Sequence, residues 1–180
     1  TLAPNAKRVL VLDGGDGLND TADFTGVTVG LTIAMKDTGA TSVTGGGTSA
    51  GTQLLNIENI IGGNGNDVLT GNTSSNRING GDGDDKIFAS LGDSETYSGG
   101  DGNDTVTFEK FTTAVSVTIG QNSVSGSATG IDHLTISNDI ESLIGSSGND
   151  VLTGGSGGGA LSGGAGNDVL TGGNGDDVLN

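Results

Sequence analysis

Bulky apolar residues recur about once every nine positions along two stretches of the chain, each time after a run of glycine and polar residues. Residues 62–70 read GGNGNDVLT and residues 80–88 read GGDGDDKIF, so a row has the form G-G-x-G-x-D-x-U-x, in which U is apolar. The row at 89–98 carries one extra residue. A repeat that keeps this phase indicates a core that receives one side chain from each row. These side chains are Leu69, Ile78, Ile87, Tyr97, Val106, Leu152, Leu161, Leu170 and Leu179.

Each row predicts a tight turn followed by a minimal strand. The glycines permit the left-handed conformations that tight turns need, and three extended residues with one inward side chain make a short strand. Two rows then form one coil of the chain. The fold class expected from this pattern is all-β, a parallel β-roll in which each coil contacts only its neighbours.

The segments outside the rows alternate apolar and polar residues, which predicts half-buried strands and no long helix. The alternating apolar positions are Val27, Val29, Leu31 and Ile33 in one segment and Val115, Val117 and Ile119 in another. Residues 56–71 also match residues 139–154 at an offset of 83, so the chain contains two copies of one unit. We expect an N-terminal partial repeat with a strand-rich segment (1–61), a first roll block (62–107), a strand-rich insert (108–144) and a second roll block (145–180).

Composition first suggests disorder, and the order of the residues then argues against it. Glycine makes up 37 of the 180 residues, aromatic residues 3 %, and the net charge is −16. Such a chain cannot build a thick core, and its bias alone is typical of low-complexity or disordered chains. A flexible linker is therefore the alternative reading of the rows, but a linker does not keep a hydrophobic phase.

The acidic residues are 18 aspartates and only 4 glutamates. Aspartate is short and tolerates turns, and its oxygens are the ligands that hard cations such as Ca²⁺ prefer. The excess of acid argues against nucleic acid and against an anionic membrane surface. The chain has no cysteine and therefore no disulfide or thiolate metal site, and no run approaches the ~20 apolar residues of a membrane span. Residues 1–5 do not resemble a signal peptide, so we expect either another export route or an origin within a longer chain.

Acidic side chains at the sixth position predict calcium sites, because rows two apart stack on the same edge of a roll. Neighbouring strands are ~5 Å apart, so stacked carboxylates would repel one another unless a cation lay between them. We expect ions between Asp67 and Asp85, between Asp85 and Asp104, and between Asp150 and Asp168. The pair Gly159 and Asp177 has lost one carboxylate and predicts a weak site, or one that needs a neighbouring module. The opposite edge of the first block offers only Asn76 and Ser94 at this position, so it is expected to be uncharged.

Other polar residues have simpler interpretations. The side chains of Asp82, Asp84, Asp101 and Asp176 occupy variable positions and are expected to be solvated. Residues 13–20 resemble a calcium-binding helix–loop–helix segment but lack its terminal glutamate and its helices. His133 has no partner set for catalysis or zinc and is expected to be structural or on the surface. Glu58 and Glu141 recur in the two copies and are expected to bond turns, whereas Asp20 is a candidate to begin a site with an upstream row.

The rows resemble the repeats-in-toxin (RTX) family of hemolysin-type calcium-binding nonapeptide repeats, over about half of the chain. The resemblance implies a right-handed parallel β-roll, Ca²⁺ bound between the turns of alternate rows, export by type I secretion, and folding in external calcium. Rows 71–79, 89–98 and 154–162 depart from the family pattern at the sixth position, which puts calcium in doubt there. The ligands that carry over are the carboxylates of Asp67, Asp85, Asp104, Asp150, Asp168 and Asp177, with the turn residues Gly62, Asn64, Gly80, Gly81, Asp82, Gly83, Gly99, Gly100, Gly102, Gly145, Ser147, Gly163, Gly164 and Gly166.

Three functions remain open from the sequence. The first is a calcium-binding structural and folding module of a secreted bacterial protein, at the cell surface or in the medium. The second is the C-terminal module of a secreted enzyme, since no protease or lipase motif occurs in this chain and no catalytic residue or organic cofactor is expected in it. The third is an adhesin or surface-layer module that binds cell-surface polysaccharide or neighbouring copies, for which the threonines at Thr70, Thr107, Thr153 and Thr171 are candidates.

Overall fold

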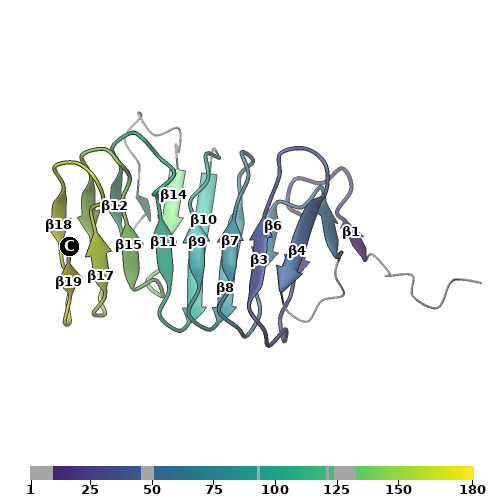
Figure 1. Ribbon diagram of the computed structural model, residues 1–180, viewed down its shortest axis with the longest axis horizontal. Helices are drawn as coiled ribbons and strands as arrows, with labels where there is room; N and C mark the ends of the chain where they lie inside the picture. Colours follow the sequence, from purple (N-terminus) through teal and green to yellow (C-terminus); the bar gives the residue numbers. More distant parts are fainter. Residues whose placement is uncertain (1–9, 46–50, 93, 121, 124–132) are drawn as a thin grey trace, which may run out of the picture.

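The computed structural model describes residues 10–45, 51–92, 94–120, 122–123 and 133–180. These residues form strands and turns and contain no helix, and therefore none long and apolar enough to cross a membrane. The strands lie side by side along the long axis of an elongated body, with β1 near one end and β18 and β19 at the other (Figure 1).

The largest sheet has ten strands and runs the length of the body. Its central pairs are parallel and join rows two apart: β7 pairs with β9, and β9 with β11. Leu69, Ile87 and Val106 therefore stand in register on one face. In spatial order the strands are β1 (Val11–Asp13), β5 (Gln53–Leu55), β4 (Thr41–Gly45), β3 (Leu31–Ala34), β7 (Val68–Thr70), β9 (Lys86–Phe88), β11 (Thr105–Thr107), β15 (Ser142–Ile144), β17 (Ala160–Ser162) and β19 (Val178–Leu179).

The opposite face is formed by two further sheets, to which the intervening rows contribute. Ile60, Ile78 and Tyr97 stand in parallel register there. The six-stranded sheet contains β13 (Asn122–Ser123), β14 (His133–Ile136), β10 (Ser94–Asp101), β8 (Arg77–Asp82), β6 (Asn59–Ile61) and β2 (Thr21–Asp23). The three-stranded sheet contains β12 (Ser116–Thr118), β16 (Val151–Thr153) and β18 (Val169–Thr171). Successive rows thus alternate between two faces, which confirms the predicted parallel β-roll.

The core is the double column of eighth-position side chains. From Leu69 to Leu161 all of them are buried, whereas Leu170 is partly buried and Leu179 is 48 % exposed. A row of nine residues brings only one large side chain inward, so the core is thin. Phe108 and Phe111 add an edge-to-face aromatic contact, with ring centroids 5.8 Å apart, where the second insert leaves the roll.

The inserts fold back as antiparallel strands that extend the sheets. β3 pairs antiparallel with β4 and β4 with β5, and β13 pairs antiparallel with β14. Leu31 and Ile33 are buried in β3 as their alternation predicts. The same alternation was wrong for Val29, which lies outside the strand and is 57 % exposed. Alternation requires burial only where the segment forms a strand that pairs with the roll, and this strand begins at Leu31.

The two copies of the unit lie on opposite faces of the roll. In the first copy, β2 pairs with β6 and β3 pairs with β7. The equivalent pairs in the second copy are β11 with β15 and β12 with β16. However, β2 and β6 belong to the six-stranded sheet, whereas β11 and β15 belong to the ten-stranded sheet. Equivalent residues of the two copies therefore line opposite edges.

Candidate metal-binding edge

The sixth-position residues of alternate rows form a continuous hydrogen-bonded ladder along one edge of the roll. The backbone N–H of Asp67 donates to Asp85 Oδ1 at 2.7 Å, and the N–H of Asp85 donates to Asp104 Oδ1 at 2.8 Å. All three aspartates are at most 2 % exposed. The structure therefore brings together the three aspartates that the sequence assigned to one edge.

The second oxygen of these carboxylates faces the glycine turn of its own row. Asp85 Oδ2 and Asp104 Oδ2 are buried and have no hydrogen-bond partner. A methyl group on Gly80 would overlap both Asp85 Oδ2 and the carbonyl oxygen of Gly99, two rows on. The missing side chain of Gly80 thus leaves a carboxylate oxygen and a carbonyl oxygen facing the same small space.

The turns need glycine for their backbone conformation as well as for this space. Gly81 and Gly100 have φ angles of 111° and 107°, which L-residues with a side chain rarely adopt. A methyl group on Gly81 would also meet the carbonyl oxygen of Gly63, and one on Gly100 the carbonyl oxygen of Gly81. Successive turns therefore stack carbonyl against glycine, so that carbonyl oxygens line the edge.

Burial makes the ionised form of this ladder costly. The pKa of Asp85 is raised to about 7, first by burial and then by the neighbouring carboxylates of Asp67 and Asp104. The pKa of Asp104 is raised to about 6, again first by burial and then by Glu141 and Asp139. Burial also raises the pKa of Asp67. Buried, closely spaced carboxylates of this kind require either protons or a cation to offset their charge.

The second roll block repeats the arrangement on the other edge. The N–H of Asp150 donates to Asp168 Oδ1 at 2.8 Å, as the sequence register predicts. Ser146 supports Asp150, with its N–H donating to Oδ2 at 2.6 Å and its hydroxyl to Oδ1 at 2.8 Å. The N–H of Gly159 donates to Asp177 Oδ1 at 3.2 Å, so this pair carries only one carboxylate.

The prediction that Ser94 occupies the sixth position of its row was wrong. Tyr97 is in register with Ile78, which places Glu95 opposite Asn76. The N–H of Asn76 donates to Glu95 Oε2 at 3.3 Å, while Ser94 is exposed. The error arose because the extra residue of row 89–98 lies before the sixth position. Counting back two residues from the apolar Tyr97 would have identified Glu95.

The edge opposite Asp67 is therefore not uncharged. Glu95 is 1 % exposed, its Oε1 has no hydrogen-bond partner, and burial raises its pKa to about 7. The Tyr97 hydroxyl donates to Glu95 Oε2 at 3.3 Å and accepts from the N–H of Ser90 at 3.0 Å. This network fills the edge with side-chain hydrogen bonds where the regular rows have aspartate.

Glu58 and Glu141 bond turns, as expected, and in doing so they take the sixth position of their rows. Glu58 Oε2 accepts the N–H of Asp20 at 3.0 Å, and Glu141 Oε2 accepts the N–H of Asp104 at 2.8 Å. Asp20 therefore faces the row that follows it along the roll. Both glutamates stand two residues before an apolar position, as the sixth-position aspartates do, and this spacing could have identified their place in the ladder from the sequence.

The carboxylate and carbonyl oxygens along the aspartate ladder are ligands of the kind that a hard cation such as Ca²⁺ prefers. The unpartnered oxygens of Asp85 and Asp104 and the glycine cradles provide the space and the donors for one. Among the residues that the structure describes, no three His, Cys, Asp or Glu side chains converge on one point. A cation on this edge would therefore take carboxylates in pairs and complete its shell with turn carbonyls and water.

His133 and the aspartates at the variable positions are exposed. His133 is exposed on β14, and Asp82, Asp101 and Asp176 are exposed in the turns. Asp84 is also exposed and accepts a hydrogen bond from the N–H of Asn103 at 3.0 Å. These positions agree with the surface roles expected from the sequence.

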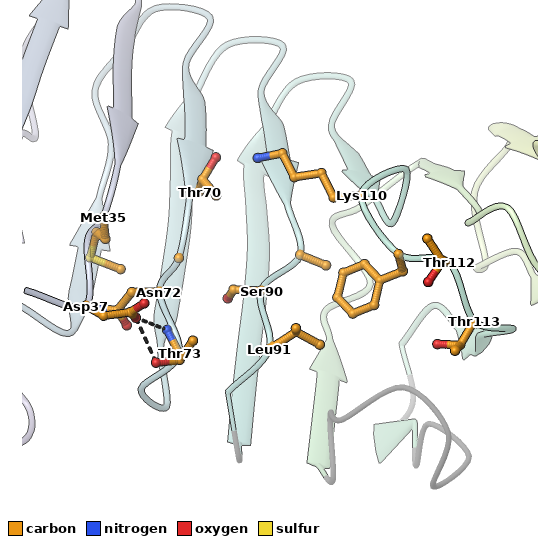
Figure 2. Close-up of a pocket in the computed structure, with 13 residues that line it drawn as sticks. Met35, Asp37, Thr70, Asn72, Thr73, Ser90, Leu91, Lys110, Thr112 and Thr113 are labelled. Carbon is orange, nitrogen blue, oxygen red and sulfur yellow. Dashed lines mark hydrogen bonds between the residues drawn. The ribbon is translucent and has the colours of Figure 1, made fainter.

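A groove of about 480 Å³ lies beside the roll, away from the ladder (Figure 2). Asp37 and Thr73 meet on one side of it, where Asp37 Oδ1 accepts both the N–H and the hydroxyl of Thr73 at 2.7 Å. Leu91 and Lys110 lie on the other side. The lining thus combines an apolar surface with a few polar groups, as ligand pockets commonly do.

The stacked coils and acidic turns define the class of calcium-binding parallel β-roll proteins. The sequence pattern of the RTX calcium-binding nonapeptide repeat matches the chain four times, over residues 61–95, 91–107, 136–158 and 159–180, which is just over half of its length. The chain belongs to the RTX calcium-binding nonapeptide repeat family. The matched repeat is a structural, calcium-binding element and not a catalytic one, and proteins that carry it are typically secreted by bacteria. A comparison with curated proteins gave no match.

Proposed function

We propose that this chain is a calcium-dependent folding module of a secreted bacterial protein. The observation that carries the proposal is the buried ladder of Asp67, Asp85 and Asp104, in which Asp85 Oδ2 and Asp104 Oδ2 have no hydrogen-bond partner beside the glycine turns. Without a cation, these buried oxygens must either stay ionised and unsatisfied or take up protons, and both alternatives cost free energy at a pH above the raised pKa values.

The proposed ligands are pairs of sixth-position carboxylates and the carbonyls of the turns between them. The pairs are Asp67 with Asp85, Asp85 with Asp104, and Asp150 with Asp168; Asp177 contributes a weaker site. Bound Ca²⁺ supplies positive charge and six to eight coordination positions for oxygen. The turn residues proposed to contribute carbonyl oxygens include Gly62, Gly80 and Gly99 in the first block and Gly145 and Gly163 in the second.

Calcium then controls folding by linkage. A ligand that binds only the folded state stabilises it by RT ln(1 + [L]/Kd), and extracellular calcium modules typically bind at roughly 10⁻⁴–10⁻³ M. At the low free calcium of a cell interior, the charge of −16 favours the open chain. Outside the cell, calcium neutralises the edges and the roll forms, which suits export of an unfolded chain by type I secretion.

Circular dichroism of the whole chain tests the proposal. In EDTA we expect the spectrum of a coil, and in millimolar CaCl₂ a cooperative gain of β signal. Equal concentrations of MgCl₂ serve as the control for ionic strength and for divalent charge, and should produce little β signal because Mg²⁺ demands a more rigid octahedral shell. A full β spectrum in EDTA, unchanged by calcium, would contradict the proposal.

Recognition of a cell-surface saccharide is a second candidate, favoured by the groove beside Asp37 and Lys110. A sugar ring presents an apolar face and a rim of hydroxyls, and the groove offers both kinds of partner: Met35 and Leu91 for the face, and Asp37, Thr73 and Lys110 for the rim. A glycan array with the calcium-loaded chain tests this, with Asp37→Ala as the variant that should lose any signal. An array without a signal would remove the candidate.

A further inference from the structure

The two places where an insert rejoins the roll share one arrangement of acidic residues. In the second copy, Asp104 donates its N–H to Glu141 Oε2 at 2.8 Å, and its carbonyl accepts the N–H groups of Glu141 and Ser142 at 3.2 and 2.9 Å. In the first copy, Asp20 has the same three bonds with Glu58 and Asn59, at 3.0, 3.1 and 2.9 Å. We define these two places as the junctions.

At each junction, glutamate stands where a regular row has aspartate. In the regular rows, the N–H of Asp85 donates to the carboxylate of Asp104 at 2.8 Å. The N–H of Asp104 donates to the carboxylate of Glu141 at the same distance, so Glu141 takes the place of the next aspartate. The longer glutamate side chain reaches the ladder from a short turn that lacks the G-G-x-G sequence. The junction therefore continues the ladder although no nonapeptide is present.

The aspartate of each junction has one carboxylate oxygen without a hydrogen-bond partner. Asp104 is 0 % exposed, and its Oδ2 is buried without a partner. Asp20 Oδ2 is likewise buried without a partner. In both cases this oxygen faces a glycine whose missing side chain leaves it room, Gly99 beside Asp104 and Gly17 beside Asp20. Glu141 uses Oε2 for the ladder bond, and its Oε1 has no donor among the described residues.

The second junction contains a further acidic residue, Asp139, besides Asp104 and Glu141. Asp139 lies at the turn, with Oδ1 accepting the N–H of Gly99 at 3.2 Å and Oδ2 accepting the Ser98 hydroxyl at 2.6 Å. Within the described part of the chain, the ion pair found joins Lys86 to Glu109, so no lysine or arginine offsets the junction. Among the described residues, the second junction therefore carries three carboxylates that no lysine or arginine pairs with, although Asp139 does not converge on one point with Asp104 and Glu141.

We propose that Asp104 and Glu141 bind a further Ca²⁺ at the second junction, and that Asp20 and Glu58 form its counterpart at the first. Asp104 Oδ2 and the second oxygen of Glu141 are the two carboxylate ligands, and backbone carbonyls and water complete the shell. Asp139 is a positioning residue that holds the turn against Gly99. Calcium would then fix each insert to the roll as well as the rows to one another. This inference rests on the proposed calcium-dependent function.

Counting bound calcium tests the inference. In Glu141→Gln the amide oxygen can still accept the N–H of Asp104, so the ladder is kept while the carboxylate charge is lost. We expect this variant to bind one Ca²⁺ fewer per chain than the wild type, measured by equilibrium dialysis of the whole chain in calcium. Glu109→Gln is the matched control, because Glu109 is an exposed partner of Lys86, and it should leave the count unchanged.

Asp85→Asn separates failure of the inference from failure of the proposed function. This substitution alters the two regular pairs of the first block, so a lower calcium count in Asp85→Asn with an unchanged count in Glu141→Gln would overturn the inference alone. An unchanged count in both would overturn the proposed function too. If Glu141→Gln does not fold, calcium-edge anomalous diffraction of the wild type decides: a peak ~2.3–2.6 Å from carboxylate oxygens of both Asp104 and Glu141 supports the site, and its absence overturns it.

Discussion

Replacing Asp85 by asparagine should raise the stability of the calcium-free roll and reduce the stabilisation that calcium provides. Asparagine has the same shape, and its Oδ1 can still accept the N–H of Asp67. Its amide nitrogen would stand near the carbonyl oxygen of Gly99, where the wild type has a carboxylate oxygen without a partner. The substitution therefore removes a buried charge while it preserves the ladder.

The size of both effects follows from the structure. Burial, together with the neighbouring carboxylates, raises the pKa of Asp85 from 3.8 to about 7, and at about 1.4 kcal/mol per pH unit the ionised side chain costs the folded state about 4 kcal/mol. Screening at the edge reduces this, so we expect Asp85→Asn to be more stable than the wild type by about 2–4 kcal/mol in EDTA at pH 8. With Kd values of about 0.1–1 mM and 10 mM free calcium, each ion contributes about 1.4–2.7 kcal/mol. Loss of both pairs that use Asp85 should lower the calcium increment by about 3–5 kcal/mol.

Osmolyte titration followed by circular dichroism measures both quantities, because osmolytes favour the compact state even where the calcium-free chain is mostly unfolded. The titration is run with both proteins in EDTA and in 10 mM CaCl₂. We expect the midpoint of the variant to lie at lower osmolyte than that of the wild type in EDTA, and to move less when calcium is added. A variant that is less stable in EDTA, or that keeps the full calcium increment, would refute the reasoning.

Three further predictions concern the cradle, the titration and the core. Gly80→Ala should reduce the β signal that calcium induces in circular dichroism by the share of the first block, because the new methyl group would meet Asp85 and Gly99. Gly157→Ala is the control: a methyl group there has nothing within 4 Å and should leave the calcium titration unchanged. In EDTA, β signal should increase as the pH falls from 8 through about 7 and level off near pH 4, since Asp85 and Glu95 have raised pKa values in the folded state only and protonation therefore favours folding; a signal that falls over this range would contradict the assigned burial. Ile87→Ala, at a fully buried site, should cost about 2–5 kcal/mol in urea unfolding with calcium, and a loss below 1 kcal/mol would argue against the packed column.

The roll was predictable because one repeating requirement determines it. A nine-residue row has a single large inward position, so the phase of Leu69, Ile87 and Val106 defines both the strands and their register. The same phase places Asp67 and Asp85 on one edge, as the structure has them.

The errors occur where the repeat is interrupted. Ser94 was assigned by counting forward from the start of a row that contains an extra residue, whereas packing holds the apolar Tyr97 in place and the turn absorbs the addition. Val29 belongs to the alternating pattern but lies before the residues at which the strand pairs with the roll. The groove was not predictable, since Asp37 comes from the first insert, Thr73 from the roll and Lys110 from the second insert, and only the folded chain brings them around one groove.

The two aspartate ladders lie on opposite edges because an odd number of rows separates equivalent points of the two copies. Calcium ions bound along a single edge would draw the coils together on that side alone and so bend the rod toward that edge. Asp67 and Asp85 lie on one edge in the first block, and Asp150 and Asp168 lie on the other edge further along the rod. A bend produced in the first block would then be followed by a bend in the opposite direction in the second, so that calcium would give the rod a shallow S shape and not a single arc.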